Sequence, residues 1–137
     1  MLCVGEYVID KKILIVEDEE SMLNSMRLVL EMAGYVIETA KNGQEAFNKI
    51  MTVNKKGKLI DLIITEIITP DLDGLNLITK LHRHNVWIPV IVINRHSDKN
   101  RVVKPLREGF VDYINKPFET ADLVLCVNNL FDKHASK

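Results

Sequence analysis

Short apolar runs alternate with longer amphipathic segments along this chain. The runs are rich in β-branched residues, which is typical of strands that are buried on both faces of a sheet. They predict five strands, over residues 13–16, 35–39, 62–66, 88–93 and 111–115. Apolar residues at helical spacing in the segments between them predict five helices, over residues 22–33, 44–51, 75–82, 97–109 and 120–133.

Strands and helices that alternate through short loops are typical of a doubly wound α/β fold, in which helices cover both faces of a parallel sheet. Right-handed crossovers leave few topologies for such a chain. The flavodoxin-like strand order 2-1-3-4-5 places the topological switch point between the first and third strands. We therefore predict a five-stranded sheet of this order, with its functional site at the carboxyl ends of those two strands.

Several residues favour the predicted helix ends. Ser21 is a candidate N-terminal cap of the first helix, and Gly34 is a candidate C-terminal cap. Thr120 is a candidate N-terminal cap of the last helix. Pro105 should kink or shorten the helix over 97–109, because proline lacks a backbone donor.

Acidic residues follow two of the predicted strands. Glu17 and Asp18 come directly after the first strand, and Glu66 ends the third. Because the carboxyl ends of parallel strands share one edge of the sheet, we expect these carboxylates to converge. Their mutual repulsion calls for positive charge, which Lys116 after the fifth strand and a divalent cation would supply. Carboxylate oxygens suit Mg²⁺, and a metal beside a lysine and a carboxylate is a sensible apparatus for phosphoryl transfer.

Composition and charge narrow the possible functions. The chain has 137 residues, which suits one domain, and a net charge of -1, which favours neither nucleic acid nor an anionic membrane. Cys3 and Cys126 are too few for a disulfide framework, and the first ten residues lack the basic segment of a signal peptide. We therefore expect a cytoplasmic protein. A glycine-rich dinucleotide motif and a P-loop are both absent.

Four stretches, in this order along the chain, carry a family resemblance. They are ILIVED at 13–18, the segment from Asp61 to Gly74, PVIVI at 89–93, and DYINKPF at 112–118. Together they resemble the response-regulator receiver domain of two-component signalling, over residues 11–133. Residues 1–10 are then a leader or an extra edge strand, and residues 134–137 are a tail or the start of a linker.

The resemblance implies a role for each residue at the predicted site. Glu17 and Asp18 would hold Mg²⁺ weakly, together with Glu66 and the backbone carbonyl of Ile68. Lys116 would contact the phosphoryl group, and Glu66 would stand at the position of the phosphoacceptor.

The same resemblance implies that Asn94 and Tyr113 stand at the two positions whose side chains respond to phosphorylation in the family, the switch residues. Tyr113 is equally well explained as an aromatic residue of the core.

Two residues depart from the family pattern. Glu66 stands where the family has an aspartate, and Asn94, followed by Arg95, stands where it has a threonine or serine. The additional methylene of glutamate moves the carboxylate by about 1.5 Å. Misplacing a reacting group by about 1 Å costs on the order of a hundredfold in rate. We therefore expect an atypical receiver.

Three functions compete on these residues. The first is a signalling receiver, not an enzyme, that communicates with a histidine kinase, a phosphotransfer protein or an output domain beyond Lys137. The second is a non-phosphorylatable pseudo-receiver that serves as a protein-interaction module. The third is a flavin-binding electron carrier of the same topology, which the acidic run Glu17 to Glu20 disfavours because it would repel phosphate. We expect no direct contact with nucleic acid or membrane.

The last predicted helix also suggests self-association. One apolar stripe on it should face the sheet, made of Leu123, Cys126, Val127, Leu130 and Phe131. Leu125 falls on the opposite side of the helix. Since receivers often pair through this region, we expect a weak homodimer through the helix over 97–109, the strand over 111–115 and the last helix.

Overall fold

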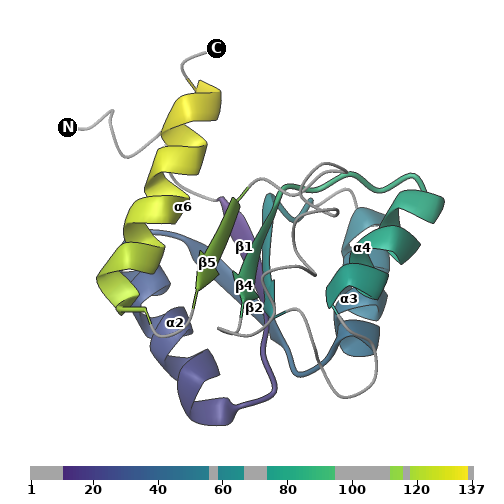
Figure 1. The fold of residues 1–137 in the computed structure, drawn as a ribbon. Coiled ribbons are helices and arrows are strands. Elements are labelled where there is room, and N and C mark those ends of the chain that lie inside the picture. The colour runs from purple at the N-terminus through teal and green to yellow at the C-terminus, as the bar shows by residue number, and fades with distance from the viewer. Residues whose placement is uncertain (1–10, 56–58, 67–73, 95–111, 116–117, 136–137) are drawn as a thin grey trace.

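The computed structural model describes residues 11–55, 59–66, 74–94, 112–115 and 118–135 (Figure 1). The predicted leader and the predicted helix over 97–109 lie outside these residues, as does the effect expected of Pro105.

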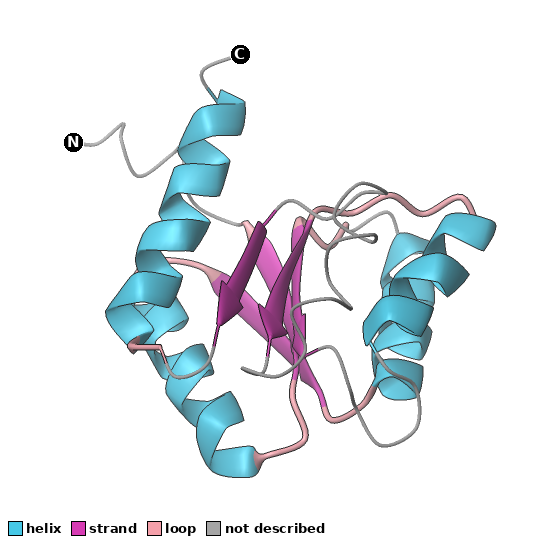
Figure 2. Ribbon diagram, in the orientation of Figure 1, coloured by secondary structure: helices cyan, strands magenta, loops and turns pink. Residues whose placement is uncertain are grey.

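Five strands and four helices make up the described part of the chain (Figure 2). The strands are β1 (Lys12–Val16), β2 (Val36–Ala40), β3 (Leu62–Glu66), β4 (Val90–Asn94) and β5 (Asp112–Asn115). The helices are α2 (Glu20–Met32), α3 (Gly43–Lys55), α4 (Gly74–Arg83) and α6 (Thr120–Ala135). All strand pairs are parallel, in the order β2-β1-β3-β4-β5. The predicted doubly wound sheet is therefore confirmed.

Helices cover both faces of the sheet. Figure 1 shows α2 and α6 on one side of it and α3 and α4 on the other. Successive side chains of a strand point to opposite faces, so each strand feeds two core layers. In β1, Ile13 and Ile15 pack in the layer of α2 and α6, whereas Leu14 and Val16 pack in the layer of α3 and α4. This double burial explains why the strand sequences are continuously apolar.

Both predicted N-terminal caps of the helices are wrong by one or two residues. Helix α2 begins at Glu20 with Glu19 as its N-cap, and Ser21 is an exposed residue of the first turn. Helix α6 begins at Thr120 itself, after Glu119, whose backbone N–H donates to the Asp122 carboxylate at 3.3 Å. In both cases an acidic side chain, rather than a hydroxyl, satisfies the backbone at the start of the helix.

Two other predicted boundaries shift for identifiable reasons. β4 begins at Val90 and not at Ile88, and Pro89 lies just before it, contributing its carbonyl to a hydrogen bond with the Ile63 N–H at 3.0 Å. Proline has no N–H to offer to the ladder, so the strand starts after it. Helix α6 continues to Ala135, which places two residues of the expected tail in the helix.

Gly34 ends α2 as predicted. Its φ of 104° is in the left-handed region, which favours glycine. The N–H groups of Gly34 and Tyr35 donate to the carbonyls of Glu31 at 3.0 Å and Leu30 at 3.1 Å. These two bonds form a Schellman motif, which turns the chain from α2 into β2.

Candidate functional site

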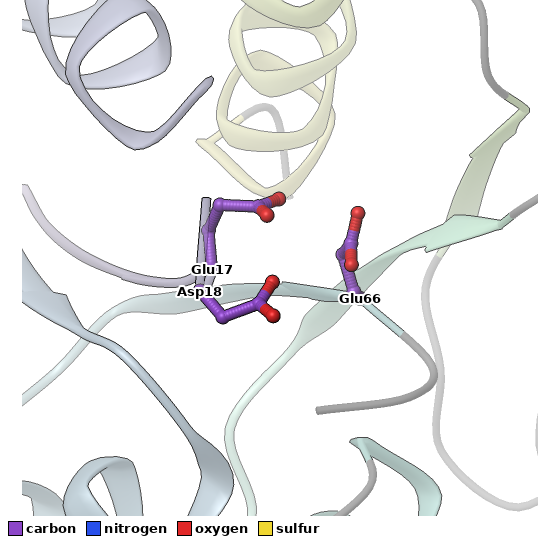
Figure 3. A group of neighbouring side chains, drawn as sticks. All are labelled: Glu17, Asp18 and Glu66. Carbon is purple, nitrogen blue, oxygen red and sulfur yellow. The ribbon is translucent and has the colours of Figure 1, made fainter. Parts of the chain in front are cut away.

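Three carboxylates meet at the carboxyl edge of the sheet. Glu17 and Asp18 directly follow β1, and Glu66 is the last residue of the central strand β3. One oxygen from each carboxylate lies within 4.8 Å of the others. Figure 3 shows Glu17 and Asp18 pointing toward Glu66. The structure therefore brings together the acidic residues that the sequence predicted to converge.

Backbone contacts fix Glu17 in this place. Its N–H donates to the Ala40 carbonyl at 3.0 Å, which continues the pairing of β1 and β2 by one residue. One oxygen of its carboxylate accepts a hydrogen bond from the Glu19 N–H at 3.1 Å. Glu19 is the N-cap of α2, so the carboxylate also holds the start of that helix. This second function of Glu17 cannot be predicted from the pattern of residues, which gives no sign of it.

Two of the three carboxylates are buried. Glu17 is 1% exposed and Glu66 is 2% exposed, whereas Asp18 is exposed. At an effective dielectric constant of about 20, two unit charges 4.8 Å apart, the limit for these carboxylate oxygens, repel by about 3.5 kcal/mol. Burial increases the need to offset the negative charge of these carboxylates, because a desolvated charge is stable only when it is paired or coordinated. Hydrogen-bond donors such as the Glu19 N–H, or a positive charge, would stabilise the carboxylates at this site.

The site also contains a buried hydroxyl that the sequence did not single out. Thr65 is fully buried, and its hydroxyl donates to the Glu66 backbone carbonyl at 2.9 Å. Glu66 is in register with Ile93 of β4, which fixes the position of its backbone in the middle of the sheet.

The other predicted site residues are described less completely. Lys116 and Ile68 lie outside the described residues. Asn94 is the last residue of β4, in register with Asn115, and Tyr113 of β5 is in register with Val92. The register places their backbones beside the site, while their side chains lie outside what the structure describes.

The parallel sheet of this order and the carboxylates at its carboxyl edge are consistent with a signalling domain of the receiver class. The family described as "Response regulator receiver domain" matches residues 13–128. This chain belongs to the response regulator receiver domain family.

Curated relatives agree with the family. The chain is 32% identical over 114 residues to the Alkaline phosphatase synthesis transcriptional regulatory protein PhoP of Bacillus subtilis, covering 83% of this chain and 45% of that protein. It is 34% identical over 125 residues to the Transcriptional regulatory protein SrrA of Staphylococcus aureus, covering 91% and 49%. The chain thus spans about half the length of these relatives.

Solved receiver domains have the same fold. The Francisella response regulator 1452 receiver domain superposes with a TM-score of 0.80 at 27% identity, covering 91% of this chain and 99% of that one. A CheY-like receiver domain protein from Methanospirillum hungatei gives 0.80 at 28% identity, covering 93% and 98%. None of the described helices has the length and apolar character that crossing a bilayer requires.

Proposed function

We propose that this chain is a receiver domain in which Glu66 occupies the phosphoacceptor position, and that it acts in a two-component pathway downstream of a histidine kinase or phosphotransfer protein. The observation that carries this proposal is the buried Glu66 carboxylate, which faces Glu17 and Asp18 at the carboxyl edge. Family membership supports the pathway. The domain would relay a signal and not turn over a substrate of its own.

The three carboxylates fit Mg²⁺. Hard oxygen ligands from two strand ends converge there, with one exposed carboxylate leaving the site open to solvent. Glu17, Asp18 and Glu66 would hold the ion, with the Ile68 carbonyl added by resemblance to the family. A bound Mg²⁺ would offset the repulsion between the carboxylates and stabilise negative charge on phosphoryl oxygens. Affinity in the millimolar range is expected, because few protein ligands surround the site.

The length of the Glu66 side chain is the unusual feature of the site. Its backbone is fixed by pairing with β4, so the extra methylene cannot be absorbed by a shift of the strand. The carboxylate therefore extends about 1.5 Å farther than an aspartate would. We propose that it reaches toward Lys116 and Asn94, into the place that a phosphoryl group would occupy. With one negative charge against nearly two for a phosphoryl group, it would mimic the phosphorylated state only in part.

Phosphorylation by acetyl phosphate and Mg²⁺, followed by intact-protein mass spectrometry, tests this proposal. In the reaction a carboxylate oxygen forms a bond to phosphorus while the bond from phosphorus to acetate breaks and acetate leaves. We expect the wild type to remain unmodified. Glu66→Asp should accept a phosphoryl group slowly, because Asn94 still lacks the hydroxyl of the usual switch residue. Glu66→Gln is the matched control, since it keeps the length and removes the nucleophile.

Rapid, Mg²⁺-dependent phosphorylation of the wild type on Glu66 would show that the longer side chain is a competent acceptor, and would exclude the mimicry. Failure of Glu66→Asp to react, with Mg²⁺ binding intact, would support the second candidate function, a pseudo-receiver that acts only by binding proteins. The observation that favours this candidate is the glutamate at position 66, where the family has an aspartate.

Self-association is a separate part of the proposal. Leu123 and Val127 of α6 are fully buried, as the predicted stripe requires, and Leu125 is 59% exposed on the other side. We propose a weak homodimer through α6, β5 and the segment over 97–109. Light scattering at high concentration should show a mass above the monomer, and Leu125→Ser should restore the monomer.

The recipient of the signal is a further part of the proposal. If the chain is part of a longer protein, we propose that an output domain after Lys137 receives the signal.

A further inference from the structure

An apolar patch lies at the amino edge of the sheet, at the opposite ends of the strands from the carboxylates. Leu59 precedes β3 and is 65% exposed, and Trp87 precedes β4 and is 64% exposed. Between them is a hollow of about 210 Å³, lined by Leu59, Ile60, Asn85, Val86, Trp87 and Ile88. We call these six residues the Leu59–Trp87 patch.

The indole of Trp87 is held in an exposed position by its neighbours. Its ring stacks on the His82 ring, with centroids 3.9 Å apart and planes inclined by 20°. Its Nε1–H donates to the Asn85 Oδ1 at 3.1 Å. Asn85 itself has a φ of 60°, and ends α4 in a second Schellman motif. Because the polar atom of the indole is already satisfied, the surface that it leaves open is apolar.

The N-terminal segment of the same chain begins beside this patch. The Lys12 N–H donates to the Asp61 Oδ2 at 2.7 Å, and the Asp61 N–H donates to the Lys12 carbonyl at 2.8 Å. Asp61 is two residues from Leu59. Only β3 separates β1 from β4, so Trp87 lies about two strand spacings, or about 10 Å, from the line of β1. Ten extended residues reach up to about 33 Å, which is ample.

The composition of residues 1–10 complements the patch. The segment MLCVGEYVID is mostly apolar, and its only charged residues are Glu6 and Asp10. The last turn of α4, which contacts Trp87 through His82, carries Arg83, whereas Lys80 of the same turn lies over the Phe47 ring of α3. A mostly apolar segment thus begins next to an apolar surface.

We propose that residues 1–10 fold back across the amino edge and cover the Leu59–Trp87 patch. This interaction surface is independent of the function proposed for the carboxylates. It makes the patch an intramolecular docking site, so that any other protein that used it would have to displace the N-terminal segment.

Trp87 is the only tryptophan of the chain, so its fluorescence reports on this patch alone. Acrylamide quenching compares the full-length wild type with the double variant Val4→Ser, Val8→Ser. We expect the quenching constant of the wild type to be at most half that of the variant, because the docked segment shields the indole. The matched control is Leu28→Ser, Met32→Ser, which removes two exposed apolar side chains from α2 and should quench like the wild type. Equal quenching of the wild type and the Val4, Val8 variant would overturn the proposal.

Dilution separates the proposed occupant from a second copy of the chain. Shielding by residues 1–10 of the same chain should not change with protein concentration. Shielding that disappears on dilution would overturn the proposal and indicate that another copy covers Trp87.

Cross-linking tests the position of the segment directly, because Cys3 lies within it. In a Cys126→Ser background, Leu59→Cys places a thiol in the patch, and Met32→Cys places one on α2, at a side chain that is 79% exposed. With oxidised glutathione as the oxidant, we expect the disulfide with Cys3 to form several-fold faster in the Leu59→Cys protein. Equal rates in the two proteins would count against docking at the patch.

Discussion

The two edges of the sheet depart from the usual distribution of residues in opposite ways. At the carboxyl edge, two charged side chains, Glu17 and Glu66, are almost completely buried. At the amino edge, two large apolar side chains, Leu59 and Trp87, are mostly exposed. Charged residues are seldom buried without a partner, and contiguous exposed apolar surface commonly marks a binding site. The two edges therefore agree with the two proposals made above, an ion held at the carboxyl edge and an apolar segment docked at the amino edge.

The chain turns differently at the two edges. At the amino edge, α2 and α4 end in Schellman motifs at Gly34 and Asn85, which depend on backbone conformation. At the carboxyl edge, the turn from β1 into α2 depends on the Glu17 carboxylate, which accepts the Glu19 N–H. Substitutions that change the preferred backbone conformation should therefore alter stability mainly at the amino edge. Changes in metal ions or side-chain charge should alter stability mainly at the carboxyl edge.

The largest effect on stability is expected for the core between the edges. Leu62 is fully buried in β3, whereas Leu59, three residues earlier, is 65% exposed. Leu62→Ala should lower the free energy of unfolding by about 2 to 5 kcal/mol, because it leaves a cavity. Leu59→Ala should lower it by less than about 1 kcal/mol. Urea denaturation of both variants measures the difference, and similar losses would mean that the amino edge is as tightly packed as the core.

Magnesium should stabilise the carboxyl edge by mass action. At a free Mg²⁺ concentration about ten times Kd, the free energy of unfolding should rise by about 1.4 kcal/mol. This corresponds to an increase in Tm of roughly 3 to 6 °C. In Asp18→Asn, the loss of one exposed carboxylate should raise the stability of the metal-free protein and nearly abolish the Mg²⁺ shift. An unchanged Mg²⁺ shift in this variant would place the bound ion elsewhere.

Gly34→Ala tests the backbone of the amino edge. Nothing lies within 4 Å of a Cβ at this position, so the cost arises from the left-handed φ alone. We expect a loss of about 1 to 2 kcal/mol in thermal or chemical denaturation. Asn85→Gly is the converse control, since glycine tolerates the φ of 60° at least as well as asparagine. The Mg²⁺ response should be unchanged in both variants.

The smallest effect concerns alkaline pH. Burial, and then the nearby Asp132 carboxylate, raise the pKa of Tyr35 above its ordinary value. Its contribution to stability is therefore fully present below about pH 10 and is lost as pH rises toward the folded-state pKa. The urea midpoint should fall with pH in this range, and fall less steeply in Tyr35→Phe. That variant also loses the hydrogen bond from the Tyr35 hydroxyl to Asn128, so the pH dependence, not the midpoint itself, is the relevant measurement.

The sequence by itself determined the sheet and the meeting of the carboxylates. Buried parallel strands require continuous apolar runs, so Leu62 to Ile64 and Ile13 to Val16 identify the central strands from composition alone. Since parallel strands end at one edge, the acids that follow β1 and end β3 had to lie near each other. Glu66 and Asn94 are departures that the sequence also identifies.

Only the tertiary structure decided which apolar residues at the start of these runs remain exposed. Leu59 and Trp87 continue the apolar patterns of β3 and β4, and nothing in that pattern separates them from Ile60 or Val90, which are buried. The helix starts at Glu20 and Thr120 were likewise set by acidic side chains that reach backbone N–H groups after folding. The physical reason is common to these cases: periodicity reports which face of an element is apolar, whereas exposure and capping depend on which neighbours the folded chain brings to that position.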